Sequence, residues 1–246
     1  MRSIPKIISG LDDDSLMAIS RLYKPVFERV VTVSSPEVAE MTKLYENCQR
    51  MVCIAYANEM ADACGPLGID PFEVAAAAST KPFGYAPFSP SLGVGGHCIP
   101  VNPFYLLSNC QFPLLEQATA TMWNRPKQIA ERALQRLAAK AGGNTTSKRR
   151  VLVAGLGFKR GQSNLSNSPG VELAKTLSVS GQVEVVWADA LVEQSAFAQV
   201  PRLADCEWTA EGLSTFDMVI VSFRQIGMDM GVLEGLQGVE VEMWCP

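Results

Sequence analysis

The chain has 246 residues, of which 48% are hydrophobic and 19% are charged, the ordinary balance of a globular protein with one or two domains. A net charge of -4 gives no electrostatic basis for binding nucleic acid or an anionic membrane surface, so we predict neither partner. The sequence has no signal-peptide pattern and no apolar run of the about 18 residues that a membrane span needs, so a cytoplasmic protein is expected.

The first 34 residues read as one strand, helix, strand unit. Residues 4–9 (IPKIIS) are a short apolar run, residues 12–27 begin with acidic side chains that suit the positive end of a helix, and residues 30–34 (VVTVS) are β-branched. Two strands alone leave an edge and an apolar face uncovered. A second copy of the chain would cover them most simply.

Residues 35–141 are predicted to form a helical central domain. Apolar side chains recur at mixed three- and four-residue spacing over residues 36–63, which indicates one long amphipathic helix that the following glycine and proline end. A short alanine-rich helix is expected at 70–78. A second long helical tract is expected at 113–141, where Pro126 can interrupt it.

Residues 142–150 (GGNTTSKRR) are polar and glycine-bearing, which is typical of a linker between domains. After them, apolar strands at 151–154, 183–187 and 218–222 alternate with helical stretches such as 169–178. This order predicts a parallel, doubly wound sheet. Residues 151–246 are therefore expected to form a Rossmann-like domain, and the chain is assigned to the α/β class.

The cysteines and the histidine argue against a metal site. The seven cysteines have no CxxC spacing, and the single histidine, His97, excludes any site built from several histidines. We therefore expect no disulfide framework, no zinc site and no other resident metal.

The stretch GVGGHCIPVNP, residues 93–103, presents Cys98 behind flexible glycines and ahead of Pro100. Glycine serves where a backbone approaches a ligand closely, so a cysteine presented there is a candidate nucleophile. The alternative is a small buried hydrophobe, the usual state of a free cysteine. His97 precedes Cys98 in what is expected to be an extended loop and would point the other way, so a Cys–His dyad is not expected.

This stretch resembles the nucleophile loop of the UDP-glucose/GDP-mannose dehydrogenase family, above all the branch that acts on UDP-N-acetylhexosamines. The family loop reads GGHCIPVDP, and its cysteine carries the sugar first as a thiohemiacetal and then as a thioester. The resemblance implies that Cys98 is the nucleophile. Asn102 stands where the family has an aspartate, which removes a carboxylate that could act as a base.

Residues 34–50 (SSPEVAEMTKLYENCQR) resemble the central helix of the family, whose lysine and asparagine correspond to Lys43 and Asn47. Positions four apart share one face of a helix, so a cation and an amide can converge on one developing oxyanion. We therefore predict that Cys98, Lys43, Asn47 and Asn102 form the catalytic set. For Lys43 and Asn47 as a pair alone, the alternative is a solvated lysine and a polar helix face.

The turn GLGFKRG, residues 155–161, matches the first two glycines of the GxGxxG dinucleotide-binding fingerprint. Arg160 stands in place of the third glycine, so the match is incomplete. The turn is more similar to the family's UDP-binding domain, whose aromatic residue and lysine correspond to Phe158 and Lys159. We expect the substrate to contact these two residues together with the flexible and aromatic residues before the cysteine: Phe83, Gly93, Gly95, Gly96, Phe158 and Lys159.

Two positions of the UDP-binding motif differ from the family. Asn164 and Ser166 replace an aspartate and an arginine. Removing an arginine that pairs with a buried anion typically costs about 2–5 kcal/mol, so weakened binding of UDP is expected.

By resemblance, residues 1–34 are the closing part of the family's NAD-binding domain. The glycine-rich phosphate turn, the threonine loop and the catalytic glutamate of that domain have no counterpart in the printed sequence. We therefore interpret the chain as the product of a shortened gene, with an engineered truncation as the alternative. We expect the protein to bind no cofactor. Because the central domain is the family's dimerisation core, a homodimer through the central helices is expected.

Three functional hypotheses remain open, and the sequence favours the first. It is a repurposed, cofactor-free enzyme that promotes an isomerisation, cyclisation or addition on a small-molecule substrate by stabilising an oxyanion beside Cys98. The second is part of an NAD-dependent UDP-sugar 6-dehydrogenase that needs a separate NAD-binding chain. The third is a non-catalytic scaffold subunit in which Cys98 is inherited without a role.

Overall fold

The computed structural model describes residues 2–140 and 148–246 of this protein. They fall into two compact units, Met1–Arg50 and Met51–Pro246, and the long helix α2 (Pro36–Cys64) contributes to both. Most of the predicted linker at 142–150 lies outside the described residues. The first strand after it begins at Arg149.

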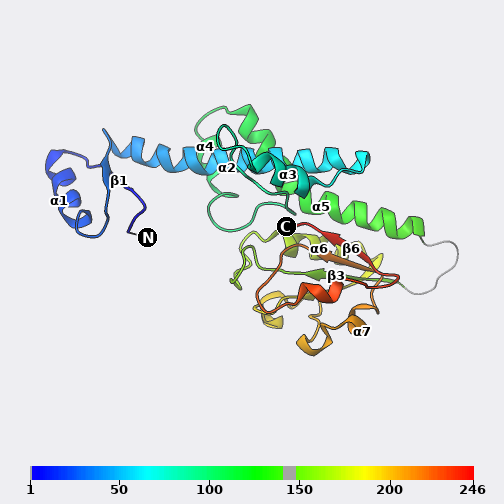
Figure 1. The fold of residues 1–246 in the computed structure, drawn as a ribbon. Coiled ribbons are helices and arrows are strands. Elements are labelled where there is room, and N and C mark those ends of the chain that lie inside the picture. Colours follow the sequence, from blue (N-terminus) through cyan, green and yellow to red (C-terminus); the bar gives the residue numbers. More distant parts are fainter. Residues whose placement is uncertain (1, 141–147) are drawn as a thin grey trace. The chain divides into compact units, whose positions relative to one another are not determined.

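The first unit contains the predicted strand, helix, strand motif. Strand β1 (Lys6–Ile8) precedes helix α1 (Asp13–Tyr23) in the sequence and strand β2 (Val30–Thr32) follows it. The two strands pair with each other in parallel, at the blue end of the chain in Figure 1. Asp12 caps α1 by accepting a hydrogen bond from the backbone of Ser15, as an acidic residue ahead of a helix should. All three elements are shorter than the sequence patterns suggest.

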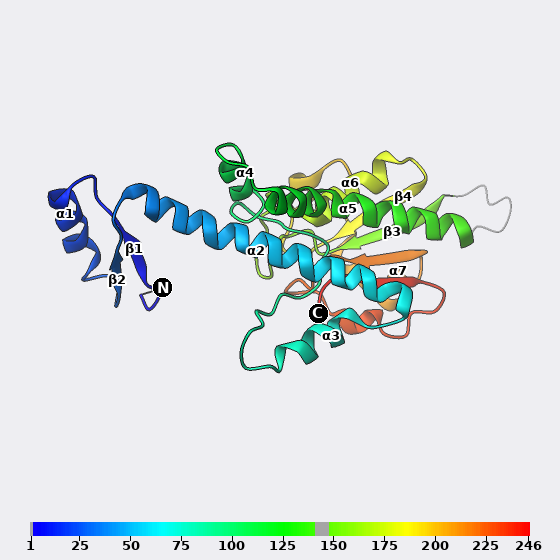
Figure 2. The same cartoon turned by 90° about the horizontal axis from the view of Figure 1, so that it is seen from above.

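The second unit contains a helical layer built on α2 and α5 (Pro113–Lys140), which overlap in Figure 1 and lie next to each other in Figure 2. Two polar contacts join these helices. The amide nitrogen of Asn58 lies 3.2 Å from the sulfur of Met122, and Arg125 pairs with Asp62 at 2.7 Å. The smaller helices of this layer are α3 (Pro71–Ser79) and α4 (Asn102–Leu107), and a 3-10 turn (Gly65–Leu67) follows α2.

Pro126 does not interrupt α5, which continues through it to Lys140. A proline inside a helix loses one backbone hydrogen bond and strains the preceding turn. Here Pro126 is buried, and its ring lies about 3.5 Å from the position that a Cβ on Gly93 would occupy. Packing against the loop that carries the cysteine therefore offsets the lost hydrogen bond.

The remaining strands form one parallel sheet in the order β4, β3, β5, β6. Their bounds are β3 (Arg149–Ala154), β4 (Val183–Ala188), β5 (Met218–Val221) and β6 (Glu240–Met243). The parallel pairing confirms the expected Rossmann-like domain, to which β6 adds a strand that its sequence, EVEM, did not reveal. Short helical segments complete the domain: 3-10 turns at Gln194–Phe197, Asp205–Glu207 and Met230–Leu233, and α7 (Ala210–Leu213).

Helix α6 (Pro169–Val179) lies between the sheet and α5, so the two layers share one apolar core (Figure 1). Leu92, Ile129 and Leu173 belong to the same buried cluster as the strand residues Val151 and Ile220. A second buried cluster covers the opposite face of the sheet. At the sheet edge, Arg136 and Lys140 of α5 form ion pairs with Glu240 of β6 at 2.9 and 2.6 Å.

Among the described residues, no helix combines the length and the apolar character needed to cross a membrane.

Candidate active site

The segment that carries the candidate nucleophile, residues 91–98, is hereafter the cysteine loop. Its first residue is held by the helical layer. Asn58 accepts a hydrogen bond from the backbone nitrogen of Ser91 at 2.7 Å, and Nε of Arg125 donates to the Ser91 carbonyl at 3.0 Å. Asn58 and Arg125 are both buried, whereas Ser91 is partly exposed, so these contacts are partly shielded from water.

The other end of the cysteine loop is held by residues 155–168 of the sheet domain. The backbone nitrogen of Gly96 donates to the Ser166 carbonyl at 2.8 Å, and the side-chain amide of Asn167 donates to the Gly96 carbonyl at 2.9 Å. A Cβ on Gly95 would lie 2.6 Å from the Cβ of Phe158, which leaves no room for a larger residue. The two glycines therefore allow Phe158 to pack against the loop.

Cys98 itself is exposed. Its carbonyl oxygen accepts hydrogen bonds from the backbone nitrogens of Val101 at 3.2 Å and of Asn102 at 2.9 Å, where α4 begins. This backbone turn fixes the spacing of Cys98 and Asn102, and that their side chains act in one site stays a prediction.

His97 faces the sheet domain. Its ring lies edge-on to Phe158 with 5.9 Å between ring centroids, and Nε2 lies 3.2 Å from the amide nitrogen of Asn164. Both contacts join the cysteine loop to the motif that the sequence related to UDP binding. The histidine is accordingly occupied in holding the loop.

Lys43 and Asn47 lie four residues apart on α2, within the first unit, as the sequence spacing predicts. Lys43 is exposed, whereas Asn47 is buried and accepts a hydrogen bond from Arg50. That these two side chains share a pocket with Cys98 stays a prediction.

The predicted substrate contacts are distributed unevenly. Gly93, Gly95 and Phe158 line a cavity of about 120 Å³ between the cysteine loop and the sheet domain. This volume is below the about 300–1,000 Å³ of typical small-molecule pockets. Lys159 is exposed next to the cavity residue Phe158, and Phe83 is 71% exposed with its ring 5.2 Å from the ammonium of Lys81.

The glycine turn, residues 155–161, does not fit the pyrophosphate of a dinucleotide. In a dinucleotide site the turn leads directly into a helix whose N-terminus faces the phosphates, but α6 begins only at Pro169. The backbone nitrogens of Leu156 and Gly157 instead donate to the buried carboxylate of Asp189 at 2.9 and 3.0 Å. Gln225 closes the turn by accepting from Gly161 at 2.8 Å.

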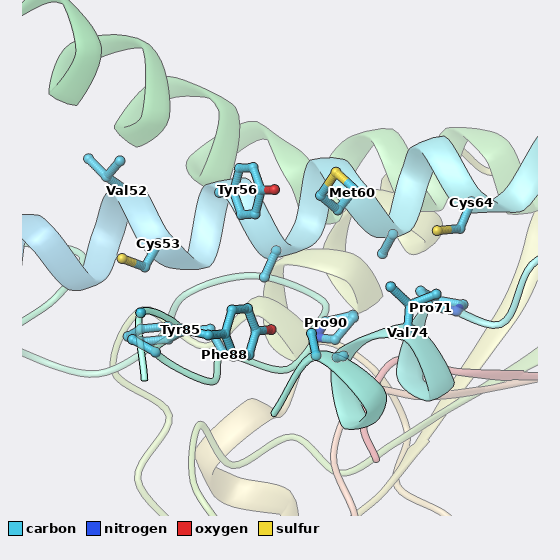
Figure 3. A pocket seen from close by; sticks show the side chains of 16 residues that line it. Val52, Cys53, Tyr56, Met60, Cys64, Pro71, Val74, Tyr85, Phe88 and Pro90 are labelled. Carbon is cyan, nitrogen blue, oxygen red and sulfur yellow. The ribbon is translucent and has the colours of Figure 1, made fainter. Parts of the chain in front are cut away.

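An apolar groove of about 400 Å³ lies between α2, α3 and the loop that precedes the cysteine loop (Figure 3). Tyr56 and Met60 line it from α2, Val74 from α3, and Tyr85 and Phe88 from the loop. Its lining contains no charged side chain. The described residues also contain no group of three or more His, Cys, Asp or Glu side chains that could hold a metal ion.

Sequence reasoning did not identify Asn58, Arg125 or Asn167, all of which position the cysteine loop. One signal was present for the first. Asn58 and Asp62 continue the stripe of the buried residues Met51 and Ala55 along α2, where a polar side chain must find a partner. Arg125 carries the same signal, because it continues the buried stripe of Ala118 and Met122 along α5, whereas Asn167 lies in a loop and has no comparable local signal.

Three comparisons place the chain among known proteins. Residues 37–129 match the model of the UDP-glucose/GDP-mannose dehydrogenase family, central domain. The chain is 30% identical over 226 residues to UDP-N-acetyl-D-mannosamine dehydrogenase of Yersinia pestis, covering 88% of this chain and 52% of the relative. It is also 30% identical over 246 residues to UDP-N-acetyl-D-glucosamine 6-dehydrogenase of Salmonella typhi, covering 93% and 55%.

Among solved structures, a UDP-D-ManNAc dehydrogenase from Pyrococcus horikoshii is similar with a TM-score of 0.80 and 23% identity, over 98% of this chain and 60% of that one. At this identity the likeness shows the fold alone. The chain spans about half the length of the curated relatives it matches.

Proposed function

We propose that this chain supplies the nucleophilic thiol and part of the substrate site of a UDP-sugar 6-dehydrogenase. The proposal starts from the match of residues 37–129 to the central domain of the UDP-glucose/GDP-mannose dehydrogenase family. An NAD-binding domain from another segment or chain would complete the enzyme. The observation that carries this proposal is the exposed Cys98 on the cysteine loop. Side-chain hydrogen bonds of Asn58 with Ser91 and of Asn167 with Gly96 hold this loop at both ends. A thiol presented in this way has access to substrate and little freedom to move away from it.

In this proposal the chain's own residues perform the covalent step. The Cys98 thiolate adds to an aldehyde carbon, a C–S bond forms, and the electron pair of the carbonyl π bond moves to its oxygen. Lys43 and Asn47 stabilise that oxyanion, which then takes a proton to give a thiohemiacetal. The substrate class, UDP-N-acetylhexosamines, is taken from what the relatives are named for.

A binding measurement tests the substrate class directly. A ligand that binds only the folded protein raises its melting temperature, so UDP-N-acetylmannosamine or UDP-N-acetylglucosamine at millimolar concentration should raise it by a measurable amount. Free N-acetylmannosamine serves as the control without the nucleotide. Absence of a shift with every UDP-sugar would contradict the proposal.

A cofactor-free enzyme remains the second candidate, and three substitutions favour it. Asn102, Asn164 and Ser166 replace charged residues of the family motifs with neutral ones, which reshapes both the cysteine site and the UDP site. Product formed from a sugar nucleotide without any added NAD, detected by mass spectrometry, would favour this candidate. If no product forms under either condition and Cys98 reacts with iodoacetamide no faster than a model thiol, the chain is a scaffold.

Asn102→Asp separates the two enzymatic candidates. A carboxylate at this position can act as a general base, so the variant should oxidise a UDP-sugar at least about tenfold faster when an NAD-binding domain of a relative is supplied as a separate chain. The rate is followed as NADH formation. If the Asn102 amide instead supports a cofactor-free reaction, the variant should turn over more slowly than the natural protein without NAD.

We further propose that the protein is a homodimer through its central helices. The apolar groove supports this, because Tyr56, Met60 and Val74 line it while remaining 65%, 42% and 40% exposed. A second copy would cover an apolar surface that is costly to leave in water. Tyr56→Glu should therefore convert dimer to monomer in light scattering after gel filtration. Gln117→Glu, which adds the same charge at an exposed position on α5, should leave the mass unchanged.

A further inference from the structure

We propose that Asn167 is a positioning residue for Cys98, acting through the backbone of Gly96. This inference rests on the proposed role of Cys98 as nucleophile and adds the device that sets the position of its thiol. Asn167 is 71 residues from Gly96 in sequence, and its side chain joins the sheet domain to the cysteine loop.

The backbone of Asn167 points to a function. Within the described ranges 2–140 and 148–246 it is the one non-glycine residue in the left-handed region, with φ of 50°. Asparagine tolerates this conformation better than most residues, but it is retained only where the surroundings demand it. Here the conformation places the side-chain amide against the cysteine loop.

Gly96 is bound on both of its backbone polar groups. Its nitrogen donates to the Ser166 carbonyl at 2.8 Å, and its carbonyl accepts from Nδ2 of Asn167 at 2.9 Å. Gly96 has φ of +94°, and a Cβ there would lie 2.9 Å from the ring of Phe158. Asn167 and Gly96, which both have a positive φ, are therefore hydrogen-bonded to each other, and Gly96 lies two positions before Cys98. Most other residues would strain the backbone at either position.

A neighbouring contact reinforces the same orientation. Asn164 uses its oxygen to accept from the backbone nitrogen of Ser166 at 2.8 Å, and its amide nitrogen lies 3.2 Å from Nε2 of His97. On the other side of Cys98, its carbonyl caps the start of α4. Cys98 is thus bracketed between the contacts of Gly96 and His97 and the first turn of a helix. Without the Asn167 amide, the Gly96 carbonyl loses this donor, and the loop before Cys98 is held only by the contacts of the Gly96 nitrogen and of His97.

Three variants separate the amide of Asn167 from its backbone conformation. Asn167→Gly keeps the left-handed conformation at no steric cost but removes the donor. Asn167→Asp keeps the shape and replaces the donor with a carboxylate that repels the Gly96 carbonyl, and Asn167→Ala removes both features. The matched control is Asn109→Gly, which removes an exposed asparagine amide that donates to a backbone carbonyl, that of Tyr105, within its own helix end at 2.9 Å.

The first readout is hydrogen exchange in residues 94–98 without substrate. In Asn167→Gly and Asn167→Asp the Gly96 amide should exchange at least about tenfold faster than in the natural protein, and in the control it should not change. The second is a nitroxide on Cys98, in a background with Cys110→Ser and Cys206→Ser. Its spectrum should gain a mobile component in the Asn167 variants only. Unchanged exchange and an unchanged spectrum in Asn167→Gly overturn the proposal.

A kinetic readout distinguishes positioning from a general loss of structure. With substrate, Asn167→Gly should lower kcat about tenfold or more while KM stays within about twofold, because misplacement of a nucleophile affects the chemical step. A purely structural role would lower the melting temperature and leave the kcat of the folded fraction unchanged. The exchange and nitroxide measurements need no turnover, so they decide the role of Asn167 even if the proposed dehydrogenase activity is not found.

Discussion

Under the proposed function, replacing Cys98 with serine is expected to reduce the rate of UDP-sugar oxidation by about a thousandfold or more. At neutral pH a serine hydroxyl is almost fully protonated and is a far weaker nucleophile than a thiol, unless a general base activates it. The adjacent His97 is engaged with Phe158 and Asn164, and no contact among the residues that the structure describes assigns it to residue 98 as a base. The measurement is the initial rate with the NAD-binding domain of a relative supplied as a separate chain.

Cys110→Ser is the matched control, because Cys110 is also exposed and lies just beyond α4. It should retain the full rate. Peptide-resolved labelling with iodoacetamide should, in addition, find Cys98 modified well before Cys245, since burial raises the pKa of the Cys245 thiol and keeps it protonated. A Cys98→Ser protein that turns over at the natural rate would remove the nucleophile from every enzymatic hypothesis considered for this chain.

The regular elements were predictable because their signals are local. The apolar periodicity of α2 and the β-branched run of β2 each specify an element without reference to the rest of the chain. Two elements had no such signal. The six residues of α4 begin within a proline-bearing loop, and β6 alternates glutamates with apolar residues because it lies at the sheet edge beside Arg136.

The candidate site was predictable only in part. Cys98 and Gly95 stand in a motif that can be recognised from a dozen residues, whereas the groups that hold that motif in place come from elsewhere in the chain. Asn58 and Asn167 are separated from their loop partners by 33 and 71 residues. The polar character of each is visible in the sequence, but its partner is fixed only by the packing of α2 and α6.

Arg125→Ala should have the largest effect on stability, lowering the free energy of unfolding by about 3 kcal/mol. Arg125 is 1% exposed, and its guanidinium donates to both carboxylate oxygens of Asp62 at 2.7 and 3.1 Å and to Ser91. It also lies 5.0 Å from the ring of Trp244. Because the Asp62 side chain is 32% exposed, water can compensate part of the loss, which places the cost at the lower end for a broken buried pair.

For a chain of this size, that loss corresponds to a fall in melting temperature of about 6–12 °C, followed by circular dichroism. Arg125→Lys keeps the charge but cannot reach Asp62 and Ser91 with a rigid fork, so it should recover only part of the stability. The control is Lys127→Ala, whose exposed ion pair with Glu172 at 3.7 Å should contribute about 0.5 kcal/mol or less. If Arg125→Ala has the same melting temperature as the natural protein, the stability of the helical layer does not depend on the ion pair between Arg125 and Asp62. The anchoring of Ser91 would then rest on Asn58 alone.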